Sequence, residues 1–251
     1  MATTSGREGP RPPWFVGMRT DAPPLTHEGI VKAAHELVHA EGIDALSLRE
    51  LAKRLGIGTS QLHRRIQRKE HLLIAVADLV LSEVPMPGTA ASASTWRSFL
   101  RRLSLNVRTS LEDHPHVHPV LDTYVLVTPA AVVIAERALS ALRAGGFRGP
   151  ALTDAYNAWA GYVFGFSVIE MQPRQQRRDR EQLRRWVRGY LKELDPDRFP
   201  TITAELPNLE NQAFGLRWEA TALGPKGTSF TVGLDAMLAG LEARRKARRA
   251  V

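Results

Sequence analysis

A short run of polar side chains is the part of this chain best suited to recognition chemistry. It follows the turn Gly56-Ile57-Gly58 and comprises Thr59, Ser60, Gln61, Arg64 and Arg65. Glutamine pairs with adenine, and arginine with guanine, through two hydrogen bonds at the base edge in the major groove of DNA. Leu62 and Ile66 are the only obvious core residues of the run. This composition favours a helix that reads nucleotide edges.

The positive charge of the neighbouring sequence is concentrated around the same run. Residues 47–69 contain seven Lys and Arg residues and a single acid, Glu50, giving a net charge of +6. Residues 26–84 as a whole contain eight basic and eight acidic residues and are neutral. A local surplus of this kind is the electrostatic footprint of a surface that approaches phosphate. The alternative interpretation is a solvated basic face on an ordinary helical bundle.

Short helices with strong end signals are predicted to position these side chains. Thr26 is a good N-cap for a helix that ends at Gly42. Ser47-Leu48-Arg49-Glu50 is a capping box, in which the serine and the glutamate satisfy each other's free amides, and it opens a second helix. A third helix is expected over 59–66 and a fourth from near Lys69. The second and third helices have the size and spacing of a helix-turn-helix.

Residues 25–80 resemble the DNA-binding region of TetR-family transcriptional regulators. The residues that carry the resemblance are Leu25-Thr26, Ala33-Ala34, Leu37, Glu41-Gly42, Ala45-Leu46-Ser47-Leu48-Arg49-Glu50-Leu51-Ala52, Leu55-Gly56-Ile57-Gly58, Leu62, Lys69-Glu70 and Leu72-Leu73. The chain departs from the family pattern at His63, Arg65 and Ile66. The resemblance implies groove or base contacts by Arg49, Thr59, Ser60, Gln61 and Arg64. It implies phosphate contacts by Thr26, Ser47, His63 and Lys69, which would fix the register on the duplex.

The rest of the chain also has a helical pattern. Residues 1–25 are rich in proline and are expected to form a mobile arm, and 85–94 to form a linker. Between Ala155 and Ile169 a predicted helix, 151–171, carries no charge and is apolar on all sides. Because such a helix must be buried on all sides, we expect one face to meet the domain core and the other a partner. Residues 195–227 are expected to form a mobile loop.

The second half is similar to the C-terminal domain of tetracycline repressors. The cues are Thr95-Trp96-Arg97-Ser98-Phe99-Leu100, Gly161-Tyr162-Val163-Phe164-Gly165-Phe166 with Glu170, and Phe230-Thr231-Val232-Gly233-Leu234-Asp235. The resemblance implies a homodimer that a small-molecule effector releases from a palindromic operator. Helices 151–171 and 228–243 of two subunits are expected to form the interface as a four-helix bundle. Candidate effector-lining residues are Phe99, Leu103, Asn106, Val107, Tyr124, Asn157, Trp159 and Phe164.

The expected effector is more apolar than tetracycline with magnesium. Several positions that contact drug and metal in the tetracycline repressor fall on Leu103, Val107 and Leu121 in this chain. The fold class that follows is all-α, with no convincing strand. It consists of an arm (1–25), a three-helix helix-turn-helix DNA-binding domain (26–84) and a larger helical ligand-binding and dimerisation domain (94–251).

Composition excludes several other classes of protein. The 251 residues contain no cysteine, which rules out disulfides and thiolate chemistry and fits a cytoplasmic location. There is no apolar run long enough to cross a membrane, so no membrane partner is expected. The motifs of hydrolases, zinc proteases and nucleotide-binding enzymes are missing. We therefore expect neither an enzyme nor a cofactor.

Two alternatives stay open. The sequence His114-Pro115-His116-Val117-His118 could bind a metal in a helical binding protein or enzyme, although alternating histidines need a further ligand from elsewhere. We favour a loop or helix start near the effector pocket and expect no metal. The second alternative is a non-specific DNA binder that uses the basic segment 174–192 and the C-terminal Arg/Lys cluster.

Overall fold

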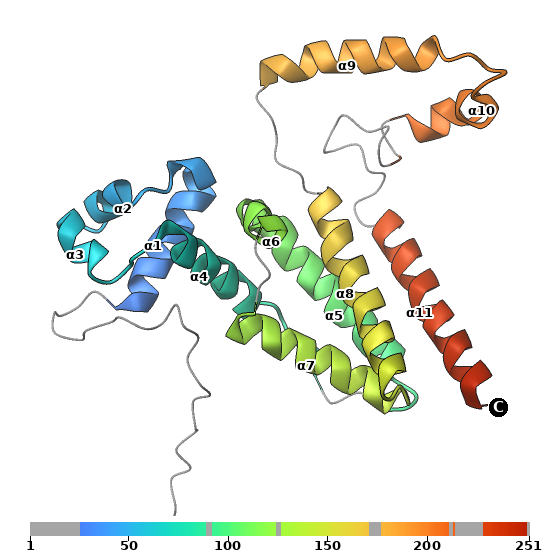
Figure 1. Ribbon diagram of the computed structural model, residues 1–251, viewed down its shortest axis with the longest axis horizontal. Helices are drawn as coiled ribbons and strands as arrows, with labels where there is room; N and C mark the ends of the chain where they lie inside the picture. The colour runs from blue at the N-terminus through green and yellow to red at the C-terminus, as the bar shows by residue number, and fades with distance from the viewer. Residues whose placement is uncertain are drawn as a thin grey trace, which may run out of the picture. The chain divides into compact units, whose positions relative to one another are not determined.

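The computed structural model describes residues 26–88, 92–123, 127–170, 177–210, 213 and 228–249. The described residues form helices and no strand (Figure 1). The α-helices are α1 His27–Glu41, α2 Leu48–Arg54, α3 Thr59–His63, α4 Lys69–Ser82, α5 Trp96–Asp113, α6 His118–Thr123, α7 Pro129–Ala144, α8 Pro150–Glu170, α9 Arg177–Lys192, α10 Pro200–Leu209 and α11 Thr228–Arg249. Two single-turn 3-10 helices are η2 Ile43–Ala45 and η3 Pro115–Val117. The expected arm, 1–25, and the candidate Tyr124 lie outside the described residues.

The chain forms two compact units. The first unit comprises Met1–Met86 and Thr109–Ala138, and the second comprises Pro87–Arg108 and Leu139–Val251. The boundaries between them fall within α5 and α7. This grouping describes packing, and the functional division into 26–84 and 94–251 stays a prediction.

Helix α1 of the first unit begins and ends where its capping residues predict. Thr26 caps α1, its hydroxyl accepting a hydrogen bond from the Gly29 amide at 3.1 Å. The helix stops at Gly42, whose φ of +90° lies in a region that side chains with a Cβ avoid. From α1, five apolar side chains enter the core of the unit: Ile30, Val31, Ala34, Leu37 and Val38. Helix α4 packs against α1 and supplies Leu72, Val76 and Val80 to the same core.

The second unit has a core built around two tryptophans and two phenylalanines. Trp96 and Phe99 come from α5, Trp159 from α8 and Phe230 from α11, and all four side chains are buried. Helix α8 packs against α11. The buried residues of α8 recur every fourth position, at Ala155, Trp159, Val163 and Ser167, and so form a single stripe along the helix.

The expected loop over 195–227 is wrong for residues 200–209, which form α10. Pro200 stands in the first turn of this helix, where its fixed φ favours helix and its missing amide hydrogen costs nothing. The Thr203 hydroxyl donates a hydrogen bond to the Phe199 carbonyl at 2.8 Å and reinforces that turn. Two other helices differ in length from the prediction. Helix α3 ends at His63 rather than at residue 66, and α11 extends to Arg249 rather than to residue 243.

Candidate DNA-reading surface and effector-binding core

The helix-turn-helix starts at the N-cap of α2. The Ser47 hydroxyl accepts a hydrogen bond from the Glu50 amide at 3.1 Å, which is one half of the expected capping box. The Glu50 carboxylate lies 3.7 Å from the Lys53 ammonium group. Whether the Glu50 carboxylate faces Lys53 or the N-cap amide, an acid in the first turn is favourable because it complements the positive end of the helix dipole.

The turn between α2 and α3 is fixed by backbone hydrogen bonds. The Ile57 amide donates to the Ala52 carbonyl at 3.0 Å, and the Gly56 amide donates to the Lys53 carbonyl at 3.1 Å. These two bonds form a Schellman motif, which requires a left-handed residue just after the helix. Gly56 supplies that residue with φ of +66°. The direction of α3 relative to α2 is therefore set by local chemistry.

Helix α3 points its polar residues away from the protein interior. Leu62 and Ile66 are buried in the first unit, as the sequence predicted. Thr59, Ser60, His63 and Arg64 are exposed, and Gln61 is half-buried at the edge of the same face. This arrangement leaves hydrogen-bonding groups at the surface, within reach of the base edges of a duplex.

Three of the candidate phosphate contacts, Thr26, Ser47 and Lys69, also make hydrogen bonds within the protein. The Thr26 and Ser47 hydroxyl oxygens accept the capping hydrogen bonds. Their O–H groups and the neighbouring amides of the helix N-terminus can still donate to an anion. Lys69 is half-buried, and its ammonium group donates to the Ile43 carbonyl at 3.3 Å. The same group has further donor capacity for a phosphate oxygen. Arg49 is exposed on the first turn of α2.

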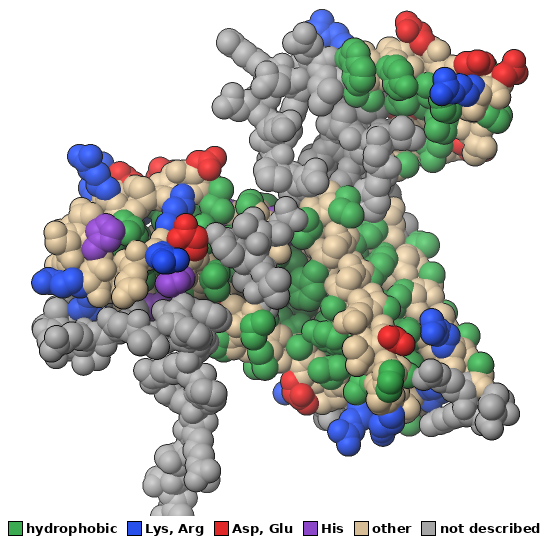
Figure 2. Space-filling model, viewed as in Figure 1, with side chains coloured by type: hydrophobic (Ala, Val, Ile, Leu, Met, Phe, Trp, Pro, Cys, Tyr) green, Lys and Arg blue, Asp and Glu red, His purple; other side chains and the backbone are tan. Residues whose placement is uncertain are grey.

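The basic residues of this region differ in how far they are neutralised. Arg54 lies 3.4 Å from the Glu41 carboxylate and Lys53 faces Glu50, whereas Arg64 and Arg68 are exposed. Figure 2 shows Lys and Arg side chains at the outer margin of the region that Figure 1 labels α2 and α3. Exposed ion pairs of this kind contribute little to stability, so the basic residues stay available to a polyanion.

The second unit contains most of the candidate effector-lining residues in its interior. Phe99, Leu103, Val107 and Trp159 are buried, and Phe164 is half-buried with its ring 6.5 Å from that of Trp159. Asn106 is half-buried on α5. The structure does not bring Asn157 to this group, because its side chain is exposed on α8.

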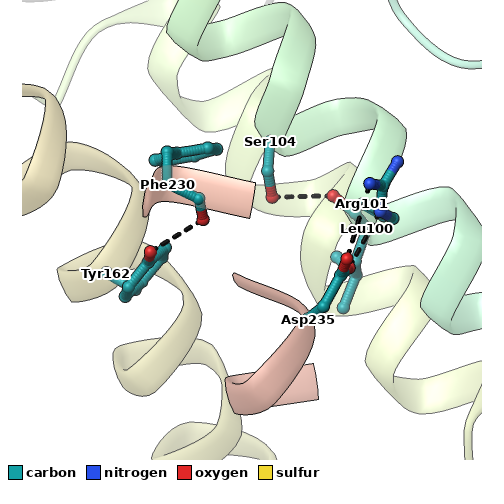
Figure 3. Close-up of polar contacts among 6 residues, drawn as sticks. All are labelled: Leu100, Arg101, Ser104, Tyr162, Phe230 and Asp235. Carbon is teal, nitrogen blue, oxygen red and sulfur yellow. Dashed lines mark hydrogen bonds and ion pairs between the residues drawn. The ribbon is translucent and has the colours of Figure 1, made fainter. Parts of the chain in front are cut away.

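Polar atoms inside this core are paired with one another. The Trp159 indole donates to the Ser104 hydroxyl at 2.8 Å. Ser104 in turn donates to the Leu100 carbonyl at 2.7 Å (Figure 3). A buried polar group that keeps its hydrogen bonds avoids the desolvation cost of an orphaned one. Sequence reasoning missed Ser104, whose only signal was its position beside Leu103 on the apolar face of α5.

Two further contacts tie α11 to its neighbours. The Tyr162 hydroxyl donates to the Phe230 carbonyl at 2.8 Å, and the Arg101 guanidinium lies 2.8 Å from an Asp235 carboxylate oxygen (Figure 3). Arg108, also missed from sequence, is buried with its guanidinium carbon 5.0 Å from the Phe230 ring centre. Arg108 therefore places a positive charge over an aromatic ring inside the core.

A cavity of about 250 Å³ lies elsewhere in the second unit, between the start of α8 and the end of α11. Its lining residues are Gly146, Phe147, Arg148, Ala151, Asp154, Ala155, Ala158, Leu241, Arg244 and Arg245. None of the seven candidate effector-lining residues that the structure describes is among them. The predicted effector site and the observed cavity are therefore distinct places.

A helix-turn-helix with an outward polar second helix, followed by a larger helical unit, defines the class of two-part DNA-binding regulators. Two family models match the chain: residues 30–76 match the bacterial regulatory proteins of the tetR family, and 87–245 match the tetracyclin repressor-like C-terminal domain. The chain belongs to the TetR family of transcriptional regulators, as the sequence predicted. This is a family of DNA-binding proteins rather than of enzymes.

Relatives and solved structures agree with this assignment. An HTH-type transcriptional regulator of Saccharopolyspora erythraea is 31% identical over 242 residues, which cover 95% of this chain and 98% of the relative. The HTH-type transcriptional repressor DrrR1 of Streptomyces coeruleorubidus is 28% identical over 91% of this chain and 83% of its own. The crystal structure of Streptomyces coelicolor ActR in complex with actinorhodin is similar with a TM-score of 0.69 and 27% identity, over 88% of this chain and 97% of ActR. Within the described residues, no helix is both long and apolar enough to cross a membrane.

Proposed function

We propose that the chain is a homodimeric repressor that binds a palindromic operator and is released by a small-molecule effector. The observation that carries the DNA-binding part is the outward face of α3, where Thr59, Ser60 and Arg64 are exposed while Leu62 and Ile66 anchor the helix. In this proposal residues 26–84 bind DNA, and residues 94–251 bind the effector and form the dimer.

The DNA contacts fall into two groups with different effects on specificity. The proposed base or groove contacts are Arg49, Thr59, Ser60, Gln61 and Arg64. The proposed phosphate contacts are Thr26, Ser47, His63 and Lys69. Base contacts discriminate between sequences, whereas phosphate contacts fix position and strengthen binding to every sequence.

Selection of binding sites from random duplex DNA with the full-length chain tests this assignment. We expect the selected sequences to converge on an inverted repeat with half-sites about one helical turn apart, because a two-fold dimer presents α3 twice. If the selected duplexes share no common sequence at fixed salt, the proposal of a specific operator is wrong and the chain is a non-specific DNA binder.

The dimer part of the proposal rests on apolar surface left exposed on α8 and α11. Ile169 on α8 is 46% exposed and Val232 on α11 is 64% exposed, although both helices bury apolar stripes inside the unit. Val232→Asp places a charge on this surface without disturbing the core, so light scattering is expected to show monomers. Val133→Asp, a change at a similarly exposed valine on α7, is the control and should stay dimeric. A dimeric Val232→Asp variant would exclude this surface as the interface.

The effector part of the proposal names a mainly apolar organic molecule. The candidates Phe99, Leu103, Val107 and Trp159 present hydrocarbon and aromatic surface, with Ser104 and Arg108 as polar handles. Actinorhodin, the ligand in the ActR crystal structure, is a suitable first probe. We expect it to lower the fluorescence polarisation of a labelled operator bound to the chain more than tetracycline with magnesium does. Release by tetracycline with magnesium alone would contradict the apolar assignment.

A further inference from the structure

A cluster of histidines in the first unit is not used by the proposed DNA or effector contacts. His35 and His39 lie one turn apart on α1, and His114 and His116 flank Pro115 at the start of η3. The His35 Nε2 and His114 Nδ1 atoms are 3.2 Å apart, and the His35 and His116 ring centres are 5.0 Å apart. The fold thus unites side chains that are 79 residues apart in the sequence.

Three of these imidazoles have the spacing of a metal-ligand set. One nitrogen from each of His35, His114 and His116 lies within 4.8 Å of those of the other two. A tetrahedral zinc ion holds imidazole nitrogens at about 2.0–2.1 Å, which places neighbouring ligand nitrogens roughly 3.4 Å apart. The 3.2 Å separation of the His35 and His114 nitrogens is already close to that value, and a nitrogen of His116 lies within 4.8 Å of both rings' ligand atoms.

One ring nitrogen of the cluster is left without a hydrogen bond. His116 Nε2 is buried, and the described residues offer it no hydrogen-bond partner. A buried nitrogen in this state bears an uncompensated desolvation cost, and such groups call for an explanation such as an ion. A metal ion at this place would use that nitrogen's lone pair.

Two histidines of the cluster have a lowered pKa because they are partly buried beside other histidines. Burial, followed by the charges of His35, His114 and other neighbouring histidines, lowers the pKa of His116 to about 3. Burial and the neighbouring His114 also lower the pKa of His35, against the opposing charge of Glu83.

We propose that His35, His114 and His116 form a site for a divalent transition-metal ion of the zinc class, with one coordination position left open. Glu83 lies beside the set, with a carboxylate oxygen 4.0 Å from His114 Nε2. Neutral nitrogen ligands suit zinc, cobalt, nickel and copper rather than magnesium or calcium. The bound ion would join α1 to η3 and hold the end of α4 close to both. The proposal does not depend on the effector or on the operator.

The structure thereby changes the ligand set that the sequence suggested. His118 does not belong to the group, because the set of nitrogens within 4.8 Å of one another does not include it. Its Nε2 atom lies 3.2 Å from the Leu111 carbonyl oxygen in a buried position. His35, from the distant helix α1, takes its place. The further ligand that alternating histidines require is supplied by tertiary packing, which the local motif could not show.

Cobalt titration of the full-length, untagged and chelator-treated chain tests the site. We expect one Co²⁺ per chain with the visible absorption of four-coordinate cobalt, displacement by one Zn²⁺, and a higher Tm with Zn²⁺ bound. His35→Gln and His116→Ala each remove a ligand. Because loss of even an outer-sphere partner costs about 10–100-fold in affinity, each variant should bind at least about 100-fold more weakly.

Two histidines outside the set provide the controls. His71→Gln, on α4, should keep both the stoichiometry and the cobalt spectrum. If His35→Gln binds like the unmodified chain while His118→Gln does not, the ligands are those of the local motif and the proposal is wrong. Sub-stoichiometric binding, or equal binding by the unmodified chain, His35→Gln and His116→Ala, would also overturn it. Circular dichroism of each variant establishes that the comparison is made between folded proteins.

Discussion

The surface of α3 and the core of the second unit contain similar polar residue types in opposite environments, exposed on α3 and buried in the core. On and just after α3, hydroxyl and guanidinium groups are exposed, the Gln61 amide is half-buried, and Leu62 and Ile66 anchor the segment in the core. In the second unit, Ser104, Trp159 and Arg108 are buried, with polar atoms bonded inside the core or placed over an aromatic ring. The first region keeps its polar groups available to a partner, whereas the second satisfies them internally.

The two regions also differ in how their geometry is established. Hydrogen bonds within a few residues position α3, through the Ser47 cap and the Gly56 turn. The second core depends on contacts such as Trp159 with Ser104, which are 55 residues apart. A substitution in the core should therefore lower stability first, and a substitution on α3 should change DNA recognition at nearly constant stability.

The largest effect is expected from Trp159→Ala in the core. Removing a fully buried tryptophan leaves a cavity and deprives Ser104 of its donor, which should cost about 3–5 kcal/mol of unfolding free energy. Trp186→Ala is the matched control, because Trp186 is 64% exposed and stacks on Tyr190 at the surface of α9. Denaturant unfolding of both variants checks this. Equal losses would show that the core is not organised around Trp159.

The same division between local and distant contacts explains what the sequence could predict. The caps at Thr26 and Ser47, the glycine turn and the start of α4 near Lys69 were all predicted correctly, because each depends on residues close in the chain. The outward direction of Thr59, Ser60 and Arg64 followed from the core positions Leu62 and Ile66, whereas Gln61 is half-buried.

Distant pairings could not be predicted from one sequence. The Ser104 partner of Trp159, the burial of Arg108 and the approach of His35 to His114 all depend on how helices pack. The helix over 200–209 was missed for a different reason: Pro200 and Pro207 were interpreted as loop residues, although proline is compatible with the first turn of a helix. Composition alone does not separate these two uses of proline.

A second prediction tests how tightly the core is packed at its edge. A Cβ at Gly145 would lie 2.9 Å from the Trp96 ring and 3.1 Å from the Leu142 carbonyl oxygen, so Gly145→Ala should cost about 1–3 kcal/mol. A Cβ at Gly189 in α9 would meet no described atom within 4 Å. Gly189→Ala should therefore be neutral or slightly stabilising. The Tm of each variant decides the matter, and an unchanged Tm for Gly145→Ala would mean that the ring can move aside.

The third prediction concerns recognition rather than stability. Gln61→Ala and Arg64→Ala should each lose about 1–3 kcal/mol of binding free energy at particular base pairs. Lys69→Ala should weaken binding to all sequences alike and flatten the dependence of affinity on salt. Arg102→Ala, an exposed arginine of the second unit, is the charge-matched control. Gel shifts on operator variants are the measurement, and equal losses on every sequence would contradict base readout by Gln61 and Arg64.

The smallest effect is expected where stability and recognition meet, at Ser47. Ser47→Ala removes the acceptor for the Glu50 amide and should cost about 1 kcal/mol in unfolding free energy. Ser47→Thr keeps the acceptor and should restore most of it. If the role of Ser47 in DNA binding is to anchor α2 against phosphate, Ser47→Ala should also weaken binding equally to operator and unrelated duplexes. A variant with lower stability and unchanged affinity would limit Ser47 to capping, because the cap and the phosphate contact draw on the same hydroxyl.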